Sequence, residues 1–504
     1  MSEGLILTII IAYFGVLILM SYITSRGADT NSFFVGNKES KWYVVAFGMI
    51  GASLSGVTFI SVPGWVDGKQ FAYMQIVLGY LVGYLVVAYV LLPIYYRMNL
   101  ISIYGYLEDR FGAWTYKTGA SLFLLSRIVG ASIRLLLAAT VFHEFIFAKW
   151  GIPFAATVTF SILFIWLCTF KGGIKTIVWT DTLQTLFMLL SLGIAIYLIS
   201  DSLGFSEQGG LVKVISESKY SKIFFFEEMG ANNYFWKQFI AGMFITIGMT
   251  GLDQDLMQKN LSCKNIKEAQ KNMVSFAFVL TIVNLAFLVL GATLFMYAQK
   301  HGVEIPMHDG KARTDLLFPT LALGDYFPQI VGVFFILGLF AATYASADSA
   351  LASLTTSVCV DFIGVRKMEE AQQKKWKDRV HVGMSVVLLI VILVLNEFMS
   401  ANAIEQILIF ASFTYGPLIG IFAFGIFTKR TLNEDKYSLF TAIAAIILTT
   451  VLFILTNKAK EITAFFALDK PFDIGFKIGA ELIIYNAVIT FVILWFVSKK
   501  TVEK

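Results

Sequence analysis

Long apolar runs separated by short polar segments fill almost the whole chain. We distinguish about thirteen of them, most near the ~20 residues that a helix needs to cross a bilayer. They lack the alternating apolar and polar positions of a membrane β-barrel. The pattern predicts an all-α polytopic membrane protein with about 13 transmembrane helices. The runs are Gly4–Thr24, Trp42–Gly64, Phe71–Tyr96, Tyr116–Phe147, Pro153–Phe170, Thr176–Ser200, Tyr234–Leu256, Ala269–Tyr297, Tyr326–Ile363, Val380–Phe398, Ala403–Phe427, Leu439–Thr456 and Phe476–Val497.

Composition points to the same environment. The chain is 57% hydrophobic and 14% charged, whereas soluble chains carry about 25% charged residues. So little polar surface cannot coat a water-soluble globule, and the lipid bilayer is the expected solvent. Cys168, Cys263 and Cys359 lie in or near predicted spans or on the inner side, so no disulfide framework is expected. The first residues lack the basic region of a signal peptide, and we expect the first run to be a retained span.

The distribution of basic residues predicts the orientation. With the N-terminus outside, the cytoplasmic segments carry 24 Lys and Arg and the outer segments 13, while Arg127 and Arg134 lie within a span. Basic residues accumulate on the cytoplasmic side of membrane proteins. The densest cluster, residues 366–379, then lies inside, as does the C-terminus. We expect a multi-pass protein of a bacterial-type inner membrane.

The second run contains a segment that weakens a helix. Gly48–Thr58 holds three glycines and three hydroxyl residues within eleven positions. Secondary transporters use such breaks to expose backbone carbonyls to ions and substrates at membrane depth. Close packing of small residues against a neighbouring helix is the alternative interpretation.

Two carboxylates lie inside predicted spans, where ionisable groups mark functional sites. Asp348 stands in the ninth run between Ser346 and Ser349, and Asp181 stands in the sixth run. Oxygen-rich clusters suit hard cations such as Na⁺. The alternative for Asp348 is neutralisation by a neighbouring arginine, and for Asp181 a helix-capping role.

Arg127 and Arg134 share one face of the fourth run. A guanidinium on such a face can hold a substrate carboxylate in a bidentate geometry. Either arginine could instead pair with Asp181 or Asp348. We favour the structural role for Arg127 and leave Arg134 open between the two.

Other classes of function find little support in the sequence. It has no GxxxxGK[ST] phosphate loop, no nucleic-acid motif and no His/Cys cluster with metal spacing, and its four histidines are scattered. An enzyme is therefore not expected, and no obligate protein partner is implied. A sensor would usually add a soluble output domain, and a channel would not need broken helices beside a carboxylate–hydroxyl cluster.

Several motifs taken together resemble the sodium:solute symporter family, which includes bacterial proline, galactose and sialic acid symporters. The resemblance implies a leucine-transporter-like 5+5 inverted-repeat core, with a second helix break near Gly242–Gly251. It divides the chain into residues 1–41, a first repeat at 42–200, an outer loop at 201–233, a second repeat at 234–428 and two C-terminal helices at 429–504. The motifs are residues 33–36 (FFVG), 51–56 (GASLSG), 172–184 (GGIKTIVWTDTLQ), 251–254 (GLDQ), 258–259 (QK), 346–362 (SADSALASLTTSVCVDF) and 415–417 (YGP).

The resemblance also implies where Na⁺, the only expected cofactor, would bind. The main site would use five positions of two helices: Gly51, Leu54, Ala342, Ala345 and Ser346. Ala345 stands where the family often has a hydroxyl, which would remove one ligand. A second site would use Asp181, Asp348 and Ser349, and there Asp348 would either strengthen cation binding or be neutralised by Arg134.

By the same resemblance, the solute would contact residues of three helices. The expected function is sodium-coupled symport of a small organic solute by alternating access, with a carboxylate-bearing solute such as sialic acid preferred. The alternatives are a neutral sugar, an amino acid or a vitamin-like solute, or coupling to protons through Asp181 or Asp348. The implied substrate residues are Ser53, Ser55, Thr58, Phe71, Gln75 and Arg134.

Overall fold

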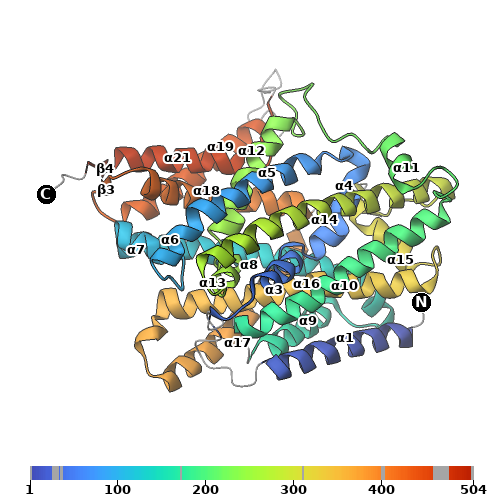
Figure 1. Cartoon of the computed structure of the whole chain (residues 1–504), viewed down its shortest axis with the longest axis horizontal. Helices are drawn as coiled ribbons and strands as arrows, with labels where there is room; N and C mark the ends of the chain where they lie inside the picture. The colour runs from blue at the N-terminus through green and yellow to red at the C-terminus, as the bar shows by residue number, and fades with distance from the viewer. Residues whose placement is uncertain are drawn as a thin grey trace.

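Helices of membrane-spanning length make up most of the molecule (Figure 1). The structure, a computed structural model, describes residues 3–24, 33, 38–170, 173–308, 311–398, 403–457 and 476–500. Among these residues, nine helices are long and apolar enough to cross a membrane, and one bent helix pair makes a tenth candidate. Every predicted run coincides with a helix or a broken pair of helices, which confirms the all-α membrane class. The number of thirteen spans is not established, because three apolar helices of the described part, including α9 and α21, are short.

The helices are α1 (Glu3–Thr24), α3 (Trp42–Ser53), α4 (Gly56–Lys69), α5 (Tyr73–Val86), α6 (Leu92–Arg97), α7 (Gly105–Phe111), α8 (Ala113–Phe142), α9 (Phe154–Thr169), α10 (Gly173–Ser202), α11 (Leu211–Glu217), α12 (Phe235–Thr246), α13 (Gln254–Leu261), α14 (Ile266–His301), α15 (Leu317–Leu323), α16 (Gln329–Ser357), α17 (Glu370–Phe398), α18 (Ala403–Phe427), α19 (Tyr437–Asn457) and α21 (Leu482–Phe496). Two short antiparallel hairpins pair β1 (Met307–His308) with β2 (Lys311–Ala312), and β3 (Thr431–Leu432) with β4 (Ser498–Lys499).

The predicted break in the second run is present. Helix α3 ends at Ser53, and α4 begins at Gly56 with its axis turned by 60°. Leu54 leaves the helical conformation, with φ −85° and ψ 88°. A helix end leaves its last four carbonyls without intrahelical partners. The backbone is therefore open for other ligands at this point.

Helices α12 and α13 are the two halves of a second broken helix. A π-helical turn at Ile247–Gly251 follows α12, and Asp253 then caps α13 by accepting hydrogen bonds from the amides of Asp255 and Leu256. The break lies slightly later in the chain than the predicted segment Gly242–Gly251, because the side chain of Asp253 fixes where the second half begins.

Small residues bring the two broken helices and their neighbours together. Helix α10 packs along α16 and α3, and α14 packs along α4 (Figure 1). Helices α5 and α12 meet at Gly79 and Gly242, each of which faces backbone atoms of the other helix. Helices α14 and α16 pack directly against both α3 and α4, on either side of the break, and α10 packs against α3.

The remaining helices lie around this core. Helix α1 packs against α9 and α10, whereas α19 and α21 pack with α18 on the far side of the molecule (Figure 1). The segment between α10 and α12 carries the short helix α11. The domain boundaries drawn from the sequence remain predictions.

Candidate substrate and cation site

A cavity lies beside the break between α3 and α4. It encloses about 810 Å³ when the open solvent at its mouth is included, which is an upper bound on the space for a ligand. Its lining comes from both halves of the core. The lining residues are Ala52, Ser53, Leu54, Ser55, Val57, Thr58, Tyr73, Tyr80, Tyr84, Arg127, Arg134, Ile245, Thr246, Met249, Thr250, Leu256, Leu280, Asn284, Ile407 and Leu408.

Four of the predicted substrate residues meet at this cavity: Ser53, Ser55, Thr58 and Arg134. The hydroxyl of Ser53 is buried and has no hydrogen-bond partner among the described residues. Arg134 forms no ion pair with any carboxylate of the described residues. A cationic guanidinium and unused hydroxyls at one cavity can receive an anionic, oxygen-rich ligand.

The other two predicted substrate residues do not line this cavity. The Gln75 amide donates to the carbonyl oxygen of Asn233 at 2.9 Å and accepts from the amide of Phe225 at 3.1 Å, so both of its polar atoms are engaged. The Phe71 amide donates to the carbonyl of Lys222. These contacts place the start of the α5 region against the loop before α12. Three tyrosines of α5 line the cavity instead: Tyr73, Tyr80 and Tyr84.

Arg127 pairs with carboxylates at the start of α13. Its guanidinium contacts Asp255 directly and lies 3.8 Å from Asp253. Tyr415 donates a hydrogen bond to the same Asp253 carboxylate. The favoured structural role of Arg127 thus has a physical basis, but its partners differ from the Asp181 and Asp348 considered from the sequence.

The positions expected to form the main sodium site lie where α16 approaches the α3–α4 break. The Gly56 Cα faces Thr343 of α16 so closely that a methyl group there would clash with the Thr343 hydroxyl. Leu54, Ala342 and Ser346 are all buried in this region. Helix α16 therefore approaches the α3–α4 break at Gly56, where the expected sodium ligands of both helices would have to meet.

Hydroxyl groups at this junction differ from the expected set. The Ser346 hydroxyl donates to the Thr343 carbonyl at 3.0 Å, and Ala345 supplies no side-chain oxygen. The Thr343 hydroxyl is buried and has no partner among the described residues, which leaves an oxygen available that sequence reasoning missed. The donor set therefore fits a hard cation, with Thr343 as a further candidate ligand.

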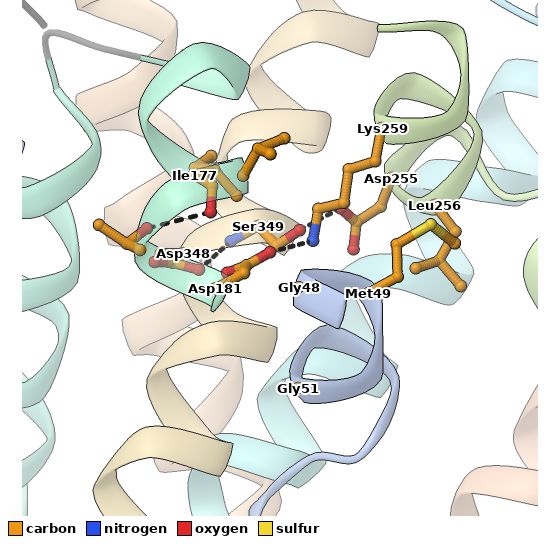
Figure 2. A network of polar contacts seen from close by, with 12 residues as sticks. Gly48, Met49, Gly51, Ile177, Asp181, Asp255, Leu256, Lys259, Asp348 and Ser349 are labelled. Carbon is orange, nitrogen blue, oxygen red and sulfur yellow. Dashed lines mark hydrogen bonds and ion pairs between the residues drawn. The ribbon is translucent and has the colours of Figure 1, made fainter. Parts of the chain in front are cut away.

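The expected second sodium site has a different arrangement (Figure 2). The Asp181 carboxylate accepts a hydrogen bond from the Lys259 ammonium at 2.6 Å, and both side chains are 1% exposed. The Asp348 carboxylate accepts from the Ser349 amide at 2.6 Å, and the Ser349 hydroxyl donates to Asp255. No cluster of three or more His, Cys, Asp or Glu suited to a metal is found in the described part of the chain. The three expected ligands lie together, but one oxygen of Asp181, one oxygen of Asp348 and the Ser349 hydroxyl are already bound by other groups of the protein.

The structure shows which basic residues pair with Asp181 and Asp348 and which do not. Asp181 is neutralised by Lys259, a residue that the sequence analysis counted among the cytoplasmic loops. No pairing of Arg134 with Asp348 is found among the described side chains. The signal for Lys259 was its place at the end of an apolar run, next to Gln258, whose amide donates to Thr356 at 3.0 Å.

Comparison with known proteins relates this geometry to transporters. A sodium/sialic acid symporter of Aliivibrio fischeri is 25% identical over 472 residues, which cover 90% of this chain and 88% of that protein. A sodium-coupled monocarboxylate transporter 1 of Mus musculus is 26% identical over 418 residues, 80% of this chain and 66% of that protein. These relatives are transporters and not enzymes.

Solved structures show the same fold. The substrate-bound, outward-open state of a Na⁺-coupled sialic acid symporter matches with a TM-score of 0.77 at 19% identity, covering 98% of this chain and 99% of that one. A nucleobase-cation-symport-1 family transporter in a closed conformation matches with a TM-score of 0.56 at 14% identity, covering 92% and 94%. The family model for the sodium:solute symporter family matches residues 33–459. The chain therefore belongs to the sodium:solute symporter family.

Proposed function

We propose that this protein is a sodium-coupled symporter that imports a carboxylate-bearing solute by alternating access, with sialic acid as the first candidate. The observation that carries the proposal is Arg134 at the cavity beside the α3–α4 break, without a carboxylate partner among the described residues. An arginine in a partly dehydrated cavity favours a ligand that brings its own negative charge. The relatives named for sialic acid and for monocarboxylates both handle carboxylates.

The break supplies the coupling. A sodium ion held by carbonyls at the end of α3 and by oxygens of α16 would tie the first repeat to the second. The ion favours the conformation in which these ligands converge, and the solute then binds in the adjoining cavity. An inward membrane potential contributes about 2.3 kcal/mol per charge and per 100 mV.

The hydroxyl groups of the cavity lining favour sialic acid over a small monocarboxylate. Ser53, Ser55 and Thr58 offer hydroxyls that suit a polyhydroxylated solute. The alternatives are a neutral sugar, an amino acid or a vitamin-like solute, and proton coupling through Asp181 or Asp348.

The test is solute binding to purified protein in Na⁺ and in K⁺, measured by calorimetry for sialic acid, lactate and a neutral sugar. We expect sialic acid to bind only in Na⁺. The Arg134→Ala variant should bind roughly 10- to 150-fold more weakly, since hydrogen bonds to charged groups contribute about 1.5–3 kcal/mol. Arg134→Lys should recover little of the loss, because a single ammonium cannot form a bidentate pair.

Arg379→Ala, which removes an exposed arginine of α17, is the matched control and should leave binding unchanged. Sodium-dependent binding of the neutral sugar alone would contradict the carboxylate proposal. Uptake that persists in choline buffer and follows a pH gradient would favour proton coupling instead.

A further inference from the structure

We propose that the ammonium group of Lys259 takes the place of a second sodium ion, so that one Na⁺ is coupled to each solute. This inference rests on the proposed sodium coupling and adds its stoichiometry. It concerns Asp181, Asp348 and Ser349, the residues that were expected to bind the second ion (Figure 2).

The position of Lys259 is that of a bound cation. Lys259 comes from α13 and Asp181 from α10, and their charged atoms are 2.6 Å apart. Lys259 is among the largest fully buried side chains of the described residues. A lysine ammonium is rarely buried unless it is paired, because removing it from water is costly. The carboxylate of Asp181 is thus the group that holds this charge inside the protein.

The surrounding oxygens show that the site attracts positive charge. Asp181 Oδ1 is buried and has no hydrogen-bond partner among the described atoms, although Oδ2 binds Lys259. Asp348 lies close enough to interact electrostatically with both Asp181 and Lys259. The ammonium of Lys259 is thus paired with Asp181 and lies within electrostatic range of Asp348, and the pocket has oxygen capacity beyond that single ammonium.

A sodium ion would find this place already filled. Even if it used the free Oδ1 of Asp181, it would lie beside the ammonium bound to Oδ2 and would be repelled by it at short range. The neighbouring oxygens are also engaged, since Asp348 accepts from the Ser349 amide and the Ser349 hydroxyl donates to Asp255. A tethered cation has a further advantage over a free ion, because it loses no translational freedom on binding.

The charges that face Lys259 from adjacent elements support this assignment. Asp255, one turn earlier on α13, is paired with Arg127 of α8, so it does not compete for the ammonium. Asp253, at the start of α13, contacts Tyr415 and lies near the same arginine. Lys259 is the cation left for Asp181 and Asp348 among the described residues of this cluster.

The experiment counts sodium ions on the purified, detergent-solubilised protein. Equilibrium binding of radioactive Na⁺ should give about one ion per chain, and sialic acid binding should rise with Na⁺ with a Hill coefficient of about one, since the coefficient does not exceed the number of sites. Lys259→Met keeps the apolar stem and removes the charge. We expect this variant to bind about two ions and to show a Hill coefficient between about one and two.

Two control variants isolate the role of the charge. Lys259→Arg keeps a cation at the position and should still bind one ion. Lys259→Met combined with Asp181→Asn removes the carboxylate that the second ion needs and should return the count to one. Size-exclusion chromatography and a thermal melt establish that each variant is folded.

The wild-type count alone can overturn the inference, even if Lys259→Met does not fold. Two ions per wild-type chain would contradict it and leave the proposed function intact. A folded Lys259→Met variant that still binds one ion would also contradict it. Wild-type protein that binds no Na⁺ would contradict the proposed function itself, and the inference with it.

Discussion

Gly51 and Thr185 hold the end of helix α3 against α10 with no room between them. The Thr185 hydroxyl accepts a hydrogen bond from the Gly51 amide at 2.9 Å and donates one to the Gly48 carbonyl at 3.4 Å. A Cβ on Gly51 would clash with that hydroxyl. Because Gly51 is expected to offer its carbonyl to sodium, this contact sets the position of a candidate ligand.

Gly51→Ala should therefore lower the apparent Na⁺ affinity as well as stability. The added methyl group must either displace the Thr185 hydroxyl from its hydrogen bonds or push α3 from α10, and overpacking of this kind costs about 1–3 kcal/mol. A thermal melt and the Na⁺ concentration for half-maximal solute binding measure the two effects. Thr185→Ala in the same chain removes the clashing hydroxyl and should restore most of the stability.

Gly193→Ala on α10 is the control, since no atom beyond its own helix lies within 4 Å of the place that the added methyl group would take. It should change neither the melt nor the Na⁺ dependence. Equal losses in Gly51→Ala and Gly193→Ala would mean that helix crowding at Gly51 does not matter.

Sequence reasoning reached some of these residues and not others. Ser53, Ser55 and Thr58 follow from the local density of glycines and hydroxyls, and Arg134 follows from its place on the helical face of a span. Lys259 and Asp181 are 78 residues apart, and nothing local to either residue indicates their pairing. The family resemblance carried over Gln75 by position, but its amide contacts depend on a loop that sequence pattern does not place.

At the scale of elements, the contact between α5 and α12 joins the two halves of the core. A methyl group on Gly79 would meet the amide nitrogen of Met243 at 2.9 Å, and one on Gly242 would meet the Ile76 carbonyl carbon at 2.9 Å. The backbones of the two helices touch at both points. Glycine is required on both sides, as in the small-residue interfaces of other membrane helices.

We predict that Gly79→Ala or Gly242→Ala lowers the thermal stability of the purified protein, by an amount corresponding to about 1–3 kcal/mol. The backbone atoms that the methyl group meets cannot move aside as a flexible side chain can. Gly130→Ala on α8, where no atom of another element lies within 4 Å, should melt like the wild type. Unchanged melting of both interface variants would show that the helices can separate at no cost.

The elements themselves were largely predictable from the chain. The apolar runs predicted the helices, and the glycines of the second run predicted the break at Leu54. The π-helical turns at Val87–Leu91 and Ile247–Gly251 were not predictable, because such turns depend on how neighbouring helices pack. The second break lies just after the expected segment, because Asp253 caps α13 and so fixes where that helix begins.

At the scale of the whole molecule, the predicted orientation can be tested by thiol labelling. The three native cysteines are buried, and burial raises the pKa of the Cys263 thiol, in the turn between α13 and α14, to about 12. Labelling reagents attack the thiolate, so Cys263 should stay unreactive at neutral pH. Labelling of the protein therefore reports only on the cysteine that has been introduced.

Glu217→Cys, at the exposed end of α11, should react with a membrane-impermeant maleimide in intact cells. Lys374→Cys, exposed on α17, should react only after the membrane is permeabilised. This result would place the loop between α10 and α12 outside and the basic cluster inside, as the Lys and Arg distribution predicts. The reverse pattern would invert the proposed orientation, and the unmodified chain serves as the background control.

Helix α13 has a consequence for how the protein is made. All eight of its residues are buried, and Asp255 and Lys259 are among them. A charged residue at the centre of a membrane helix costs about 2.5–3.5 kcal/mol at the moment of insertion. Arg127 and Asp181 are synthesised before this segment. Ser349, whose hydroxyl donates to Asp255, is synthesised about ninety residues after it. The short helix thus gains this partner only after α16 has been synthesised, so the buried polar network around α13 is completed after α13 itself has been made.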